Sequence, residues 1–267
     1  MERKTGICVR EEQLLGILVT EGMSKFFGGV KALNGVDLDV KEGTVHGLIG
    51  PNGSGKTTTF NVITGVYKPT AGSIKFCGEE IGGLKPYEIT AKGIARTFQT
   101  PKTMTKMSVV DNVMCGRYCR TKADVGGTFF RLPFTKSKQE KQIREDAMRS
   151  LEFVGLAGKA QRMAGDLAWA DQQLLQIARA MATEPKLLLM DEPTAGMGAA
   201  ESERMEEIIK ELKRQGMTII LIAHDVKLVT RASDTVTAIE FGMKIAEGLP
   251  EEVNNNPKVV EAYLGTD

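Results

Sequence analysis

The chain has 267 residues, 42% of them hydrophobic and 6% aromatic, so it can bury a full core in one large domain. Its 35 basic residues nearly balance its 34 acidic residues, which argues against binding nucleic acid through a strong positive field. Because no apolar stretch approaches the roughly 18 residues of a membrane span, and residues 1–12 lack an apolar signal core, we expect a globular protein that stays in the cytosol.

Short β-rich runs dominate the chain up to about residue 82. They predict strands over Leu14–Met23, Val36–Val40, Thr44–Ile49 and Ser73–Cys77, with a helix over Lys56–Thr64. We interpret this part as the start of an α/β core that opens with antiparallel strands.

A glycine-rich loop, Gly50–Thr57, lies between the third strand and the helix. Its glycines let backbone N–H groups turn inward, while Lys56 brings a positive charge toward the β- and γ-phosphates and Thr57 offers a hydroxyl to Mg²⁺. An accidental glycine-rich turn is the alternative, and the flanking strand and helix argue against it. The residues predicted to bind a nucleoside triphosphate are Gly50, Pro51, Asn52, Gly53, Ser54, Gly55, Lys56, Thr57 and Thr58.

Helical patterns replace the strands between residues 103 and 164. Helices are predicted over Val109–Tyr118 and Ser137–Val154, separated by Gly126-Gly127 and an aromatic run of Phe129, Phe130 and Phe134. We predict an inserted helical subdomain here. The aromatic run either packs between helices or contacts a membrane or a partner.

After this subdomain, predicted helices and strands alternate along the chain, as they do in a parallel sheet. The predicted elements are helix Asp171–Thr183, strand Lys186–Met190, helix Ala200–Gln215, strand Thr218–Ala223, helix Val226–Ala232, hairpin Thr235–Gly248 and a capping helix Pro250–Leu264.

Two carboxylates, Asp191 and Glu192, follow the predicted strand that ends at Met190. At the edge of a parallel sheet, the first carboxylate can hold the Mg²⁺ shell and the second can polarise the attacking water. An acidic pair after a buried strand is often only a turn or a helix cap. The upstream phosphate loop favours the catalytic interpretation.

The order of these motifs resembles the ATPase subunits of ATP-binding-cassette transporters, over almost the whole chain from about Leu14. The resemblance implies that Gln99, in Arg96-Thr97-Phe98-Gln99, senses Mg²⁺ and the attacking water, and that His224 contacts the γ-phosphate. It implies that Phe27 stacks on adenine. Considered singly, Gln99 is equally a loop residue, Phe27 a core aromatic and His224 a polar group at a helix start.

The resemblance implies a single ATP-binding-cassette domain over residues 1–267, of the α/β class. A P-loop nucleotide hydrolase core (14–100 and 165–248) carries an antiparallel β subdomain, an inserted α-helical subdomain (103–164) and a C-terminal cap (249–267). The implied ligands are ATP and Mg²⁺, with catalytic roles for Glu192, His224 and Gln99 and metal contacts from Thr57, Gln99 and Asp191.

The family's signature, Leu-Ser-Gly-Gly-Gln, has a divergent counterpart in Leu167-Ala168-Trp169-Ala170-Asp171. In the family, the signature of one subunit completes the ATP site of its partner. Ala168 lacks the hydroxyl, Ala170 adds a Cβ where close approach is needed, and Asp171 brings negative charge near phosphates. Gly198 likewise replaces the family's Asp or Asn. We therefore expect a weakened donated site. One intact and one weakened site would suit a heterodimer, and a homodimer stays open.

Within the family, the chain is most similar to ATPases of branched-chain amino-acid importers. The similar strings are Ala95-Arg96-Thr97-Phe98-Gln99-Thr100, the insertion Cys119–Gln139, and the ending from Asn254-Asn255-Asn256-Pro257 to Glu261-Ala262-Tyr263-Leu264-Gly265. The implied partners are a second ATPase subunit, two membrane permeases and, indirectly, an extracytoplasmic substrate-binding protein. We expect no nucleic-acid partner, and a location on the cytoplasmic face of the membrane through the permeases.

Three alternatives remain open at this point. Lipopolysaccharide-export ATPases look similar. A non-transport cassette that acts as a nucleotide-gated clamp is disfavoured by the single cassette and the near-zero net charge. A catalytically feeble regulatory subunit is favoured by Ala170, Asp171 and Gly198.

Overall fold

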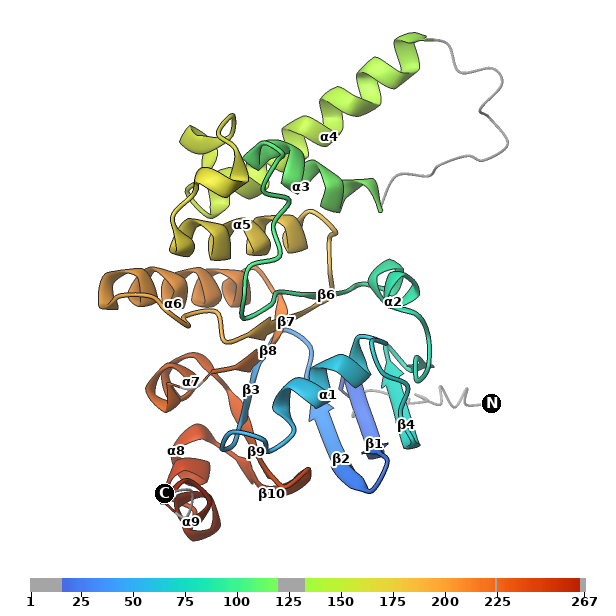
Figure 1. Cartoon of the computed structure of the whole chain (residues 1–267), viewed down its shortest axis with the longest axis vertical. Helices are drawn as coiled ribbons and strands as arrows, with labels where there is room; N and C mark the ends of the chain where they lie inside the picture. The colour runs from blue at the N-terminus through green and yellow to red at the C-terminus, as the bar shows by residue number, and fades with distance from the viewer. Residues whose placement is uncertain (1–15, 120–132, 224, 265–267) are drawn as a thin grey trace, which may run out of the picture.

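The computed structural model describes residues 16–119, 133–223 and 225–264. Figure 1 shows two sheets in its lower half and a layer of helices, α3, α4 and α5, above them. The chain passes from the sheets into this helical layer after β6 and returns to the sheets after α5.

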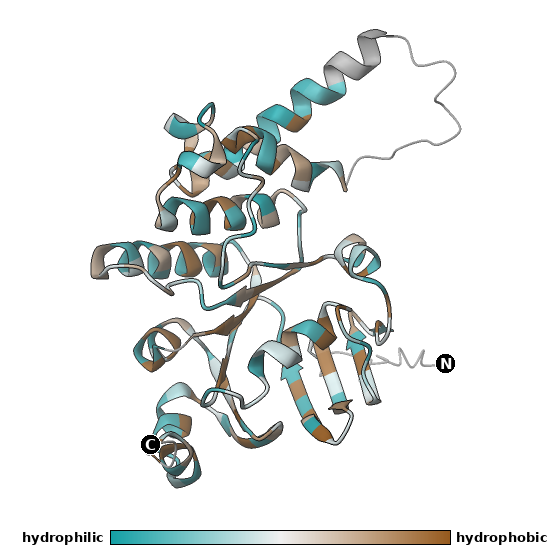
Figure 2. Cartoon of the chain, viewed as in Figure 1, coloured by the Kyte–Doolittle hydropathy of each residue, from teal (hydrophilic) through white to brown (hydrophobic). Residues whose placement is uncertain are grey.

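The central sheet has the strand order β10-β9-β3-β8-β7-β6, and its strands are parallel except for β10. Along β7, Leu188 and Met190 enter one hydrophobic cluster whereas Leu187 and Leu189 enter the other. The middle of the sheet is therefore buried on both faces, which is why the neighbouring strands β7 and β8 are almost wholly apolar and appear brown in Figure 2. The bounds are β3 Val45–Ile49, β6 Ile94–Arg96, β7 Leu187–Asp191, β8 Thr218–Ile222, β9 Thr235–Glu240 and β10 Met243–Gly248.

A second sheet is antiparallel, in the order β2-β1-β4-β5. One face of it and helix α1 pack on the central sheet through a cluster that contains Leu18, Leu38, Phe60 and Phe76. The bounds are β1 Leu18–Phe27, β2 Val30–Val40, β4 Ala71–Phe76 and β5 Glu79–Glu80.

Helices α1 and α2 pack into the same cluster as the second sheet, whereas the remaining helices cover the other face of the central sheet or form the upper layer. The bounds are α1 Lys56–Ile63, α2 Pro86–Lys92, α3 Val109–Tyr118, α4 Pro133–Phe153, α5 Trp169–Met181, α6 Ala199–Arg214, α7 Val226–Ala232, α8 Pro250–Asn254 and α9 Pro257–Leu264. Two short 3₁₀ turns, Ala157–Lys159 and Ala164–Asp166, precede α5.

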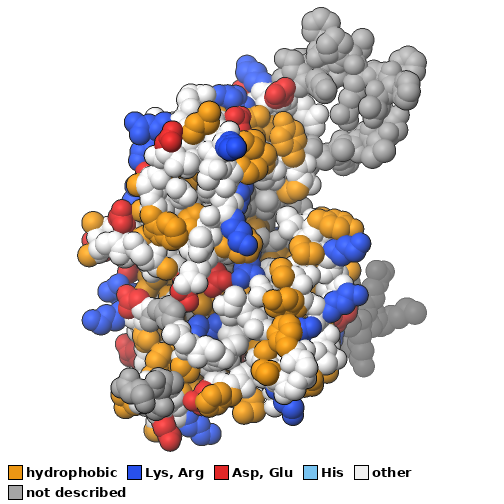
Figure 3. Space-filling view, in the orientation of Figure 1, with side chains coloured by type: hydrophobic (Ala, Val, Ile, Leu, Met, Phe, Trp, Pro, Cys, Tyr) orange, Lys and Arg blue, Asp and Glu red, His pale blue; other side chains and the backbone are white. Residues whose placement is uncertain are grey.

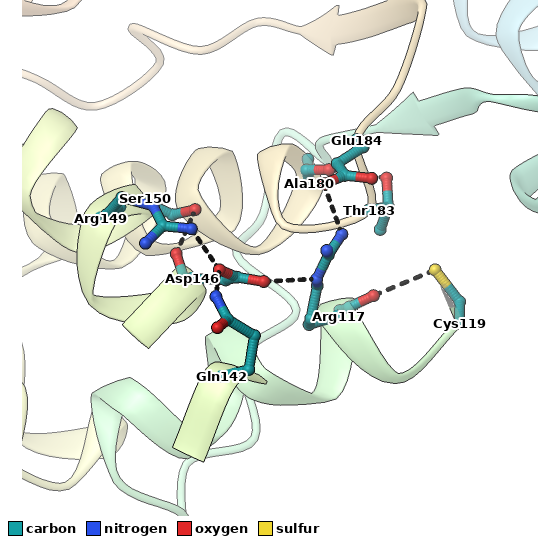
Figure 4. Close-up of polar contacts among 10 residues, drawn as sticks. Arg117, Cys119, Gln142, Asp146, Arg149, Ser150, Ala180, Thr183 and Glu184 are labelled. Carbon is teal, nitrogen blue, oxygen red and sulfur yellow. Dashed lines mark hydrogen bonds and ion pairs between the residues drawn. The ribbon is translucent and has the colours of Figure 1, made fainter. Parts of the chain in front are cut away.

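Arg117 joins three parts of the upper layer (Figure 4). From α3 it donates to Asp146 on α4 at 3.0 Å and pairs with Glu184, beyond the end of α5, at 2.6 Å. Glu184 raises the pKa of Arg117 further, so the guanidinium is permanently charged. This junction fixes the orientation of α3 and α4 over α5.

The structure confirms the α/β class with its antiparallel sheet and helical layer, and it reproduces the predicted bounds of α3 and α7. Several expectations need correction. Strand β1 continues past Met23 to Phe27 through register shifts, and β2 begins at Val30 instead of Val36. The sequence analysis missed α2, β5 and β6. Gly126, Gly127, Phe129 and Phe130 lie outside the described residues, as does the side chain of Phe134.

The predicted capping helix Pro250–Leu264 is two helices, α8 and α9. Pro257 has no N–H, and its ring disfavours helical geometry at Asn256. The Asn256 side chain instead accepts a hydrogen bond of 3.0 Å from the backbone of Lys258 and caps α9. Across the residues that the structure describes, none of the helices has the length and apolar character to cross a membrane.

Candidate functional site

The loop between β3 and α1 folds into a cradle because glycines stand at its sharpest points. Gly50 and Gly55 have φ values of 153° and 110°. A Cβ at Gly50 would lie 2.1 Å from the Ile239 carbonyl oxygen, and one at Gly55 would lie 2.8 Å from that of Ala32. The loop can therefore pass this closely under β9 and β2 only with glycine at both positions.

Lys56 is buried at the first position of α1, and its Nζ donates to the carbonyls of Gly50 at 2.6 Å and Pro51 at 2.9 Å. Burial lowers the pKa of Lys56, while the nearby carboxylates of Glu192 and Asp191 oppose that shift. The cation thus lies in the loop before any ligand arrives.

A cavity of about 460 Å³ opens above this loop. Its lining is mainly polar and consists of Ala32, Asn52, Gly53, Ser54, Gly55, Lys56, Thr57, Thr58, Gln99 and Glu192. Within the described part of the chain, the buried Ser54 hydroxyl oxygen has no hydrogen-bond partner. An unpaired hydroxyl, a buried cation and a helix N-terminus facing one cavity fit a polyanionic phosphate group.

Glu192 and Gln99 meet at one side of this cavity. The Gln99 Nε2 donates to Glu192 Oε2 at 2.7 Å, although 93 positions separate them. Glu192 directly follows β7, and its φ of 48° is unusual for a residue with a side chain. Such conformations cluster at active sites, where the surrounding structure maintains them. A buried carboxylate held beside the phosphate loop can orient a water molecule.

Asp191 is the last residue of β7, and it is not among the residues that line the cavity. It forms a buried ion pair of 2.7 Å with Arg96, whose second nitrogen donates to Asn61 at 2.6 Å. The Arg96 guanidinium also lies 5.4 Å from the Phe60 ring and 5.0 Å from the Phe98 ring. Arg96 thus holds Asp191 in one orientation behind the phosphate loop.

The donor set around the loop fits a Mg²⁺ ion that arrives with a nucleotide. Thr57 and Gln99, which both carry a side-chain oxygen, line the cavity, and Asp191 lies next in sequence to Glu192. Mg²⁺ prefers one or two protein oxygens together with substrate phosphates over a complete cage of side chains. The described residues contain no cluster of three or more His, Cys, Asp or Glu that could hold a metal ion.

Phe27, predicted to stack on adenine, is not among the residues that line this cavity. Phe27 ends β1 with 43% of its surface exposed, and its ring packs edge-on against Tyr67 at 5.1 Å. Lys25 Nζ lies 5.0 Å from the centre of the Phe27 ring. His224 lies outside the described residues, and the adjacent Asp225 caps α7 by accepting from the Lys227 backbone at 2.9 Å.

The divergent signature begins helix α5, with Ala168 as its cap. The negative charge expected from Asp171 is compensated, because this largely buried carboxylate pairs with Lys159. Trp169 donates from its indole nitrogen to the Ala195 carbonyl at 2.8 Å. The structure therefore links the signature to the loop that follows Glu192.

Sequence analysis missed Arg96 as the partner of Asp191, Asn61 as the second acceptor of Arg96, and Ala32 as a cavity residue. The only local sign of this role is that Arg96 is a charged residue directly after the apolar residues Ile94 and Ala95. Figure 3 shows basic and acidic side chains interspersed over the visible face of the molecule.

Comparisons with known proteins agree with this geometry. The ABC transporter family profile matches residues 33–195, and a branched-chain amino acid ATP-binding cassette transporter profile matches residues 243–267. The chain is 41% identical over 250 residues to the high-affinity branched-chain amino acid transport ATP-binding protein BraF of Pseudomonas aeruginosa, covering 93% of this chain and 98% of that protein. It is 41% identical over 252 residues to a probable branched-chain amino acid transport ATP-binding protein, LivG, of Archaeoglobus fulgidus, with 93% and 95% covered.

A solved ATP-binding cassette of an ABC transporter, in its ADP conformation, superposes with a TM-score of 0.82 at 37% identity, covering 94% of this chain and 99% of that chain. A phosphate loop at the carboxyl edge of a parallel sheet is the arrangement of P-loop nucleotide hydrolases, and this chain is one of them. The profile and the relatives make the assignment narrower. The chain belongs to the ABC transporter family, as one of its ATP-hydrolysing cassettes.

Proposed function

We propose that the chain is the ATPase subunit of an importer for branched-chain or related amino acids. The observation that carries the proposal is the Gln99–Glu192 contact at the mouth of a phosphate cradle. The profile over residues 243–267 and the names of the relatives favour amino-acid import over lipopolysaccharide export.

Each residue of the site has a separate role in the proposed hydrolysis. Backbone N–H groups of the loop and the Lys56 cation bind the β- and γ-phosphates. Glu192 orients the attacking water and accepts its proton, and Gln99 holds the Glu192 carboxylate in place. Mg²⁺, held by Thr57, Gln99 and Asp191, would neutralise charge that develops on the phosphate oxygens. Phe27 is proposed to cover the adenine and His224 to contact the γ-phosphate.

Assembly completes the proposed activity. A second ATPase subunit would supply its own signature to this cavity, while two permeases would hold both subunits at the cytoplasmic face of the membrane. A substrate-binding protein would deliver the amino acid on the other side. Closure and reopening of the ATPase pair would then move the permeases, since positioning supplies most of the catalysis in phosphoryl transfer.

Reconstitution tests this proposal. The chain, a partner ATPase with an intact signature and two candidate permeases are placed in liposomes together with a leucine-binding protein. We expect ATP-dependent leucine uptake that the Lys56→Ala variant abolishes. ATP hydrolysis without uptake of leucine or of any other amino acid would refute the import assignment and leave the ATPase assignment intact.

A further inference from the structure

The C-terminal cap, made of helices α8 and α9, has no part in the chemistry described so far. It is nevertheless anchored in the core, because Val253, Val259 and Ala262 are almost completely buried. Val253 and Val259 belong to the same hydrophobic cluster as the central sheet, and Tyr263 packs against that cluster. Helix α9 lies against β10 in the lower part of Figure 1. Because the cap is anchored in the core, its polar side chains can hold the groups that they contact in place.

One of those contacts reaches the start of the phosphate loop. The backbone N–H of Gly50 donates to the hydroxyl of Tyr263 at 2.9 Å, across 213 positions of sequence. β3 pairs with β8 up to Leu48 and with β9 up to Ile49. The Gly50 N–H therefore lies just beyond the paired part of the strand. Tyr263 supplies the acceptor at the point where the chain leaves the sheet and enters the loop.

The same glycine is held from its other side by the lysine of the phosphate loop. The Gly50 carbonyl accepts from Lys56 Nζ at 2.6 Å. Because a Cβ at Gly50 would clash with Ile239 and Ser54, the backbone here has little freedom to adjust. A shift of the Gly50 amide would therefore move the carbonyl on which the Lys56 cation rests.

A second polar contact ties the cap to helix α7. Asn254 on α8 donates to the Thr230 hydroxyl at 2.6 Å, and that hydroxyl donates to the Val226 carbonyl at 2.8 Å. Val226 is the first residue of α7, two positions after His224. The cap therefore contacts both the phosphate loop and the helix that follows the proposed γ-phosphate histidine.

We propose that the C-terminal cap positions the phosphate loop of this ATPase, with Tyr263 as the positioning residue. This inference rests on the proposed function, since it assigns the cap a role in binding ATP at that same site. Residues 243–267, which carry the match to the branched-chain amino acid transporter profile, include both Tyr263 and Asn254. Tyr263 touches no reacting atom and acts through Gly50 and Lys56.

The test compares Tyr263→Phe with Tyr87→Phe in the full chain. The first variant removes the hydroxyl while keeping the ring, and Tyr87, 67% exposed on α2, is the matched control. Equilibrium binding of a non-hydrolysable ATP analogue is measured together with KM and kcat. Loss of one neutral hydrogen bond should weaken binding and raise KM by about three- to tenfold in Tyr263→Phe only, with kcat changed less than twofold.

Amide exchange measured by NMR separates positioning from general stability. We expect the Gly50 amide to exchange faster in Tyr263→Phe, while amides of β8 keep their wild-type rates. Equal nucleotide affinity and equal Gly50 exchange in the two variants would overturn the proposal. So would a general rise in exchange across α8, α9 and β8 with unchanged affinity, which would mark a purely structural role. Because binding and exchange do not require turnover, a wild-type chain that fails to hydrolyse ATP even together with its partner ATPase would refute the proposed function alone.

Discussion

Gln99 and Glu192 form a hydrogen bond of 2.7 Å that joins the segment after β6 to the end of β7. The Gln99 backbone carbonyl also accepts from Gln173 on α5 at 2.6 Å. A movement of the helical layer would therefore reach the carboxylate that orients water. This arrangement gives a physical route from the layer that holds α5 to the chemical step.

Replacing Gln99 with Ala should lower kcat by about 10- to 100-fold, because the Glu192 carboxylate loses a charge-assisted hydrogen bond. KM should change little if Gln99 acts through Glu192. Steady-state ATPase measurements test both. Gln215→Ala is the matched control, since Gln215 donates to Glu211 in an exposed pair away from the cavity. A large rise in KM with unchanged kcat would contradict this role.

Arg96 is expected to be essential for stability through its buried pair with Asp191. Arg96→Gln leaves a buried carboxylate without its cation, which should lower the free energy of unfolding by about 3–5 kcal/mol. Arg96→Lys should recover only part of the loss, because an ammonium cannot reach Asn61 and Asp191 with the same fork. Denaturant unfolding measures both. Arg214→Gln removes an exposed pair with Glu211 and should have little effect. Equal losses for Arg96→Gln and Arg214→Gln would contradict the assignment.

The burial of His46 should make the stability of the protein depend on pH. This fully buried residue on β3 contacts Thr237 and Thr235, and burial lowers the pKa of His46 from 6.5 to about 4. Glu247 and Asp39 oppose the shift and Lys244 adds to it. The unfolded chain therefore binds a proton more readily, so stability present above pH 6.5 is lost as the pH falls toward 4.

The loss attributable to His46 should approach about 3 kcal/mol. Because carboxylates also titrate in this range, the measurement is the difference between wild type and His46→Gln in unfolding free energy at pH 7.5, 6 and 4.5. The wild type should lose more stability than the variant on acidification. Parallel curves would show that His46 does not titrate in this way.

Lys159 should matter for the site that this chain donates to its partner. Removing the cation in Lys159→Met leaves the Asp171 carboxylate unpaired at the start of α5. The partner-stimulated ATPase rate should fall, and the rate of the chain alone should not. The double variant Lys159→Met/Asp171→Asn should recover most of the loss, because it removes the uncompensated charge. A double variant as slow as Lys159→Met would exclude this electrostatic explanation.

Local patterns predicted the elements on which the site is built. Apolar runs ending at Ile49 and Met190 identified strands buried on both faces, and the glycine spacing of Gly50–Thr57 identified the cradle, since these signals lie within a few residues of each other. The contacts that complete the site join distant positions. Arg96 meets Asp191 across 95 residues, and Gly50 meets Tyr263 across 213. Only the strand order and the docking of α9 bring them together.

The measurement that tests the central claim most directly is ATP turnover by the Glu192→Gln variant, beside equilibrium binding of ATP. The amide preserves the size of the side chain but cannot accept a proton from water. We predict ATP affinity within about threefold of wild type and a fall in kcat of at least about 100-fold. A variant that hydrolyses ATP at the wild-type rate would contradict the assignment of Glu192 and the mechanism that depends on it.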